Sequence, residues 1–100
     1  MEKFKPHYSL AKVCELIAAG KVRATATAFG GALELGIESL EGMCAVILGL
    51  TQGNFYKSMT TRCDHTIWQD VYHAQTKSGD QAYIKLTVIE DVLIVSFKEL

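Results

Sequence analysis

The sequence has little proline, few cysteines and no long hydrophobic run. It contains one proline and three cysteines in 100 residues, and apolar stretches such as Cys44–Leu48 are too short to span a bilayer. The cysteines are widely spaced without a Cys-x-x-Cys pair, and no apolar signal core follows Met1. These absences exclude a disulfide scaffold and a collagen-like chain, and they predict a reduced, cytoplasmic protein.

An excess of charge of one sign is also missing. Ten lysines and arginines balance eleven aspartates and glutamates, which gives a formal net charge of −1. Non-specific affinity for nucleic acid comes from lysine and arginine at phosphates, so any nucleic-acid site must be a local patch. Hydrophobic residues make up 49% of the chain, a share that excludes intrinsic disorder. This length and composition predict one domain over residues 1–100.

Helical periodicity dominates the first half of the chain. Three helices are predicted there, each preceded by a residue that can cap its first turn: Ser9, Thr25 or Thr27, and Ser39. The first ends at Gly20 and the second near Gly36, with a short strand over residues 21–25 between them. Gly30 and Gly31 disfavour the second helix by about 1 kcal/mol each relative to alanine. The buried stripes of the first and third helices are predicted as Leu10, Val13, Cys14 and Ile17, and as Leu40, Met43, Cys44, Ile47 and Leu50.

Short segments rich in β-branched and aromatic residues follow from Phe55 to the end. Strands are predicted over residues 55–61, 66–73, 82–89 and 92–98, with a hairpin loop at 76–80. Strands this close in sequence pair as an antiparallel meander, and the helices must cover one face of that sheet to bury their stripes. The predicted fold class is therefore α+β, an antiparallel β-sheet with helices packed on one face.

Alternation along the strands assigns side chains to the two faces of the sheet. The helix-covered face is predicted to receive Ile84, Leu86, Val88, Leu93, Val95 and Phe97. The opposite face then carries Tyr83, Lys85 and Lys98, with Gln69 and Lys57 as further candidates. The pattern leaves open which face of its strand Gln69 occupies.

Lysine, tyrosine, glutamine and histidine side chains on strands suit metal-free cleavage of RNA. Such cleavage needs a group that removes the 2′-hydroxyl proton, a cation beside the phosphate and a proton for the leaving 5′-oxygen. Aromatic rings can hold unpaired bases by stacking. Taken alone, the pattern favours a structural role, because strand aromatics usually pack and strand lysines often protect an edge. A triad of Cys63, His65 and Asp70 is disfavoured, because neighbours in sequence seldom form one.

Long runs of the sequence resemble the MqsR toxin family, the motility quorum-sensing regulators. The runs are Phe55–Thr61, Asp64–Tyr72, Leu86–Ile89 and Asp91–Glu99, and shorter matches include Pro6-His7, Val22-Arg23 and Gly42-Met43-Cys44. The resemblance extends over the whole chain. It implies a RelE-like toxin fold and an mRNA interferase of a type II toxin–antitoxin system. Such an enzyme cleaves single-stranded mRNA at GCU-type sites without a metal, a cofactor or the ribosome.

The same resemblance implies site residues and partners. It places functional residues at Lys57, Gln69, Tyr83 and Lys98. The predicted catalytic residues are Lys57, Gln69 and Tyr83, and Lys98 is predicted to bind RNA together with His65 and Lys85, which the strand pattern adds. The implied partners are the mRNA substrate and a cognate MqsA-like antitoxin, with operator DNA reached only through that antitoxin and no membrane. Family members often carry a basic residue after Val-Tyr, where this chain has His73. A non-catalytic RNA- or protein-binding module on the same scaffold is the alternative interpretation.

The strand runs also predict where a protein partner docks. Residues 55–61 and 66–72 are long, rich in apolar residues and free of proline. An unprotected strand edge of this kind pairs readily with a strand of another chain. A strand of the antitoxin is therefore predicted beside, or covering, one of these two runs. The alternative is that the helices, or a symmetric second copy of the chain, close this edge.

Overall fold

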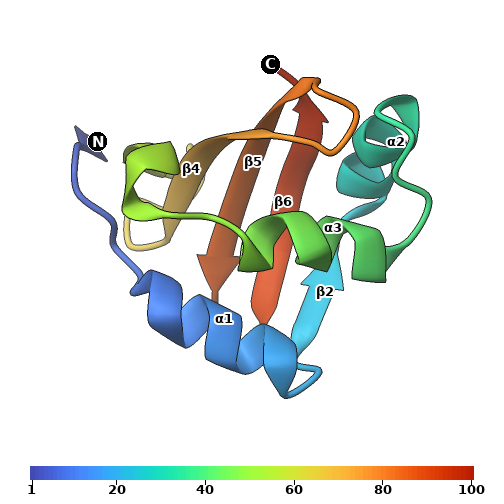
Figure 1. The fold of residues 1–100 in the computed structure, drawn as a ribbon. Coiled ribbons are helices and arrows are strands. Elements are labelled where there is room, and N and C mark those ends of the chain that lie inside the picture. Colours follow the sequence, from blue (N-terminus) through green and yellow to red (C-terminus); the bar gives the residue numbers. More distant parts are fainter.

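A computed structural model describes residues 1–100, with three α-helices, one short 3₁₀-helix and a six-stranded sheet (Figure 1). The helices are α1 (Leu10–Ala18), α2 (Ala26–Glu34), α3 (Leu40–Leu48) and the 3₁₀-helix η1 (Gln52–Asn54). The strands are β1 (Glu2–Lys3), β2 (Val22–Ala24), β3 (Phe55–Thr60), β4 (Trp68–Gln75), β5 (Gln81–Val88) and β6 (Val92–Glu99). Their order in the sheet is β1-β3-β4-β5-β6-β2.

Strands β3 to β6 form the predicted antiparallel meander at the centre of the sheet. β1 pairs antiparallel with β3 at one edge, and β2 pairs parallel with β6 at the other. α1 and α3 cross in front of the sheet in Figure 1, and we call the face turned away from them the open face. The predicted α+β class is confirmed, whereas β1 and the parallel pairing of β2 were absent from the prediction.

Each α-helix begins after the capping residue that the sequence predicts. The hydroxyl oxygens of Ser9, Thr25 and Ser39 accept hydrogen bonds from backbone N–H groups three residues on, at 3.3, 3.0 and 3.0 Å. Thr25, and not Thr27, caps α2. Its hydroxyl also donates to the carbonyl oxygen of Val95 at 2.8 Å, which ties the start of α2 to β6.

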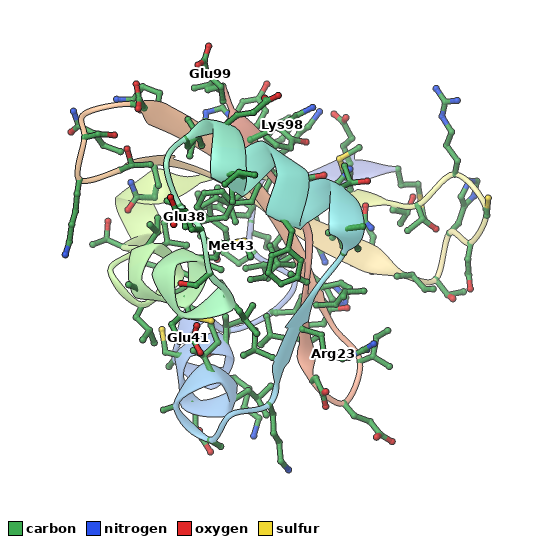
Figure 2. The ribbon with its side chains drawn as sticks, turned by 90° about the vertical axis from the view of Figure 1, so that its right-hand side faces the viewer. Arg23, Glu38, Glu41, Met43, Lys98 and Glu99 are labelled. Carbon is green, nitrogen blue, oxygen red and sulfur yellow. The ribbon has the colours of Figure 1, made fainter.

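α2 lies beside β6, where the short strand β2 has ended (Figure 2). A Cβ atom on Gly31 would lie 2.1 Å from the carbonyl oxygen of Phe97 and 3.0 Å from the Cβ atom of Lys98. A Cβ atom on Gly30 would meet nothing within 4 Å. Gly31 is therefore needed for the close approach of α2 to β6, which explains one of the two glycines that disfavour this helix.

Nineteen buried apolar residues form one cluster between the helices and the sheet. The stripe residues predicted for α1 and α3 and found buried are Leu10, Val13, Ile17, Met43, Cys44, Ile47 and Leu50. Cys14 is half-buried and Cys63 is exposed. None of the three α-helices is long and apolar enough to cross a lipid bilayer.

The predicted faces of β6 are partly wrong. Leu93 and Val95 are expected on the helix-covered face, but the core residues of this strand are Val92, Ile94 and Phe97. The pairing of β6 with β5 shifts register between Lys85 and Leu86, so Val95 is one extra residue in β6. Such a β-bulge reverses the alternation of the residues that precede it. Lys98 follows the bulge and keeps its predicted place on the open face.

The predicted docking edge is also partly wrong. β4 lies between β3 and β5, so both of its backbone edges are paired and no partner strand can join it. β1 covers part of β3, where Glu2 pairs with Met59 and Lys3 with Ser58. A partner strand beside residues 66–72 is therefore excluded, because long-range pairing has made that run the interior of the sheet.

Candidate active site

Aromatic and cationic side chains form a row across the open face. Tyr56 on β3 stacks on His73 of β4, with ring centroids 4.3 Å apart and ring planes inclined by 23°. The His73 ring centroid lies 6.0 Å from that of Tyr83 on β5. Lys98 on β6 ends the row with its Nζ atom 5.1 Å from the centre of the Tyr83 ring. The register produces this row, since His73 lies opposite Tyr83 and Tyr83 lies opposite Lys98. We call these four residues the stacking row.

Tyr56 reaches the open face because β3 also contains a bulge. The pairing of β3 with β4 shifts register between Phe55 and Lys57, so Tyr56 is the extra residue. Phe55 packs against the core, where its ring meets that of Tyr72 edge-on. Lys57 lies on the open face with its Nζ atom 5.5 Å from the centre of the Tyr56 ring. The bulge thus places two consecutive side chains, Tyr56 and Lys57, on the same face.

Lysines surround the centre of this face. Lys57 and Lys85 are the cross-strand partners of Val71, one on each side. Val71 is fully buried although no helix lies over it, so the hydrocarbon stems of its neighbours provide the cover. Burial lowers the pKa of the Lys85 ammonium, and the charges of Lys98 and Lys57 lower it further. Lys98 lies at the end of β6 beside α2 (Figure 2).

A carboxylate from β1 holds Lys57. The Nζ atom of Lys57 donates a hydrogen bond of 2.7 Å to Oε2 of Glu2, and the Lys57 side chain is only 20% exposed. The hydrogen bond to Glu2 raises the pKa of Lys57, while partial burial opposes the rise. At neutral pH this lysine is therefore a cation held in one place.

The hydroxyl of Tyr83 keeps its proton at neutral pH. Burial raises the pKa of Tyr83, and the nearby charge of Lys57 only partly opposes that rise. A protonated phenol can donate a hydrogen bond or a proton to an oxygen that gains negative charge. The open face therefore combines fixed cations with a proton donor, as phosphodiester cleavage requires.

The two other predicted site residues, Gln69 and His65, lie in different parts of the structure. Gln69 lies on the open face, because its cross-strand partner is Met59 and the next residue on the same face is Val71. It is thus a diagonal neighbour of Lys57. His65 lies in the exposed loop between β3 and β4 and makes no hydrogen bond, ion pair or ring contact with these residues.

The disfavoured triad does not form. The Asp70 carboxylate accepts hydrogen bonds from the backbone N–H groups of His7 and Tyr8, at 3.1 and 2.9 Å. Asp70 is fully buried, and its cross-strand partner Leu86 belongs to the core, so it faces away from the open face. No group of three histidine, cysteine, aspartate or glutamate side chains lies close enough to hold a metal ion.

Known protein sequences match this chain over almost its whole length. The family model described as "Motility quorum-sensing regulator, toxin of MqsA" matches residues 5–99. The chain belongs to this family. A relative from Escherichia coli (strain K12), named "mRNA interferase toxin MqsR", is 58% identical over 99 residues, which cover 99% of each chain. The resemblance inferred from the sequence runs is thereby confirmed.

Three residues of the candidate site in this MqsR-family chain, His73, Tyr56 and Glu2, are not among the site residues predicted from the sequence. His73 has the same strand parity as Gln69, so alternation could have placed it on the open face. Tyr56 precedes Lys57 directly, and alternation would place the two on opposite faces unless the bulge were known. Glu2 lies in a two-residue strand, which is too short to show any periodicity.

Proposed function

We propose that the protein is the toxin of a type II toxin–antitoxin system, an endoribonuclease that cleaves mRNA and so stops translation and growth. Residues 1–100 form the toxin domain. One observation carries the proposal: Lys57 and Lys85 lie beside the stacking row, which itself ends in Lys98, on the open face of the sheet in a chain of net charge −1. The relative's name, mRNA interferase, fits the substrate that such a face would bind.

Different residues of the open face can carry out the different steps of transesterification. The 2′-oxygen loses its proton and attacks phosphorus, and the bond to the 5′-oxygen breaks as that oxygen takes up a proton. Lys57 and Lys98 stabilise the negative charge that builds up on the phosphoryl oxygens. Tyr83 gives the proton to the 5′-oxygen, and the amide of Gln69 orients the phosphate. Lys85 is the lysine best suited to accept the 2′-hydroxyl proton, because its pKa is lowered.

The stacking row favours single-stranded RNA. Unpaired bases stack on aromatic side chains, and each such contact contributes about 1–3 kcal/mol. Tyr56 is 48% exposed, so a base can cover its free surface. We propose that bases flanking the cleaved bond stack along this row, at GCU-type sites and without help from the ribosome.

The proposed partners follow the family. Its description names MqsA as the antitoxin of such toxins, and we propose an MqsA-like protein as the partner here. Operator DNA is reached through that antitoxin, and the cytoplasm is the proposed compartment. The outer edge of β3 near Phe55 is not covered by β1, which pairs only with Ser58 and Met59, so this is the part of the two predicted runs where we propose that a partner strand is added.

Cleavage is expected to proceed with EDTA present. The Lys and Tyr groups supply both proton transfer and charge stabilisation, so the products should carry a 2′,3′-cyclic phosphate or 3′-phosphate and a 5′-hydroxyl. The measurement is end analysis of a labelled single-stranded RNA with GCU sites. An RNA with a 2′-deoxy residue at the cleaved position serves as the control. Products with 5′-phosphate ends would contradict this mechanism, and binding without cleavage would favour the non-catalytic module.

Lys98 is expected to bind phosphate through its charge. Lys98→Arg should keep most of the activity, because arginine retains the charge and can stack on Tyr83. Lys98→Ala should raise the apparent KM and reduce the slope of log K against log salt by about 0.7, the value for one contact to single-stranded nucleic acid. Lys12→Ala on α1 is the matched control and should change neither quantity. Equal loss in Lys98→Arg and Lys98→Ala would indicate proton transfer by Lys98 instead.

A further inference from the structure

We infer that Glu2 is a positioning residue for the proposed cleavage: it holds Lys57 protonated and oriented, so that Lys57 acts as the cation at the scissile phosphate and not as the base. The inference rests on the proposed function and adds to it a residue from the other end of the chain. It also distinguishes two roles that a catalytic lysine can have, the cation that stabilises the phosphate charge and the base that takes the 2′-hydroxyl proton.

The register of β1 on β3 places Glu2 beside Lys57. Glu2 lies opposite Met59, two residues along β3 from Lys57, so the two side chains are diagonal neighbours on the open face. The distance of 2.7 Å from Nζ to Oε2 is that of a charge-assisted hydrogen bond. Glu2 is 47% exposed at its side chain and Lys57 only 20%, so the carboxylate lies at the rim and the ammonium further in.

β1 itself is fixed on both sides. The backbone N–H of Thr60 donates to the carbonyl oxygen of Met1 at 3.0 Å. Within β1, the Nζ atom of Lys3 lies 4.2 Å from the centre of the Trp68 ring. After β1, the Asp70 carboxylate accepts a hydrogen bond from the backbone N–H of His7. The Glu2 backbone is therefore anchored, and its side chain can fix the rotamer of Lys57.

Glu2 is the one carboxylate in contact with the lysines of this face. The other titratable groups that face Lys57 are Tyr56 on its own strand and Tyr83 and Lys85 on β5. His73 on β4 stacks on the ring of Tyr56. Loss of the Glu2 charge would therefore remove the hydrogen bond and the attraction that favour the charged form of Lys57, and the pKa of Lys57 would fall.

The ion pair does not block the substrate. An ammonium group has three N–H donors, and Glu2 uses one of them. Two donors remain for phosphoryl oxygens, so Lys57 can bind Glu2 and RNA together. Lys85 has no carboxylate partner and its pKa moves in the opposite direction to that of Lys57. Opposite shifts in neighbouring groups of one kind separate the roles of cation and base.

The sign of the pH dependence follows. Because the pKa of Lys57 is raised by Glu2, its charged form persists to higher pH, and activity that needs this charge is lost only as pH rises through the raised pKa. Glu2→Gln removes the charge with little change of shape. The alkaline limb of the kcat profile should then move to lower pH, and kcat should fall by about tenfold, less than the 10²–10⁴-fold expected for removal of an acid–base group. KM should change less than kcat.

The experiment combines two readouts. NMR titration of lysines labelled with ¹³C at Cε reports the pKa of Lys57 without RNA, and the pH–rate profile uses a DNA strand with one ribonucleotide at the cleaved position. We expect both the pKa and the alkaline limb to move down together in Glu2→Gln. Glu2→Asp keeps the charge but shortens the reach, so it should give a smaller shift. Glu15→Gln is the matched control, since Glu15 pairs with Lys12 on α1, and it should match the native protein.

Three outcomes would overturn the inference. An unchanged Lys57 pKa in Glu2→Gln would mean that the ion pair contributes nothing in solution. A lowered pKa with an unmoved alkaline limb would mean that Lys57 is not the required cation. Faster cleavage by Glu2→Gln near neutral pH would make Lys57 the base. A native protein that cleaves no RNA would instead refute the proposed function, and the titration would still report on the ion pair.

Discussion

Tyr83→Phe is expected to cleave RNA about 10²–10⁴-fold more slowly than the native protein while binding it nearly as well, because only the hydroxyl is lost. The ring keeps its place between His73 and Lys98, so the stacking row remains. Burial raises the pKa of the Tyr83 hydroxyl, which makes it a proton donor at neutral pH. Its contribution should therefore be lost as pH rises through that raised pKa, and not as pH falls.

Single-turnover cleavage and RNA-binding titrations measure the two effects separately. Tyr83→Ala removes the ring as well, so both the rate and the affinity should fall. Tyr8→Phe is the control, because the Tyr8 hydroxyl forms a hydrogen bond with Thr87 and its side chain packs against the buried apolar cluster. A native cleavage rate in Tyr83→Phe would show that the tyrosine acts by stacking alone.

Gly31→Ala is expected to lower the free energy of unfolding by about 1–3 kcal/mol, the usual cost of overpacking. The added Cβ atom would meet the carbonyl oxygen of Phe97 at 2.1 Å, so α2 and the end of β6 must separate. The same movement displaces Lys98, whose Cβ atom lies 3.0 Å from that position, and RNA affinity should fall with stability.

Gly30→Ala is the matched comparison in the next residue of the same helix. No atom lies within 4 Å of its added Cβ, so the better helix propensity of alanine should raise stability by up to about 1 kcal/mol. Urea unfolding followed by circular dichroism measures both variants. Equal stability in the two variants would contradict the close contact of α2 with β6.

Features set by neighbouring residues could be predicted from the sequence. The caps at Ser9 and Ser39 depend on a side chain and an N–H group three residues away, and both are confirmed. The meander follows from short connections between strands. Residues 66–72 illustrate the limit, because their place inside the sheet depends on β3 and β5 pairing on both sides, which no local pattern reveals.

The same limit applies to the site. Lys57, Tyr83, Lys85 and Lys98 could be placed on one face because alternation holds along most of each strand, and the resemblance independently selects three of them, Lys57, Tyr83 and Lys98. Glu2 stands 55 positions before Lys57, and only the pairing of β1 with β3 brings the two together. Local sequence contains no signal for that pairing, so the charge state of Lys57 could not be inferred from it.

The two bulges mark the positions at which β3 and β6 can lose one residue while the other side chains stay on their present faces. Val95 and Tyr56 are extra residues, so deleting either would restore a regular ladder and leave the later side chains on their present faces. The losses would differ, since Val95 supplies the carbonyl that accepts the Thr25 hydroxyl and Tyr56 supplies the first ring of the row. Deletion of one residue elsewhere in these strands would move the side chains that follow to the opposite face of the sheet. Relatives shorter by one residue in β6 should therefore lack it at the bulge, with the lysine that corresponds to Lys98 still facing the tyrosine.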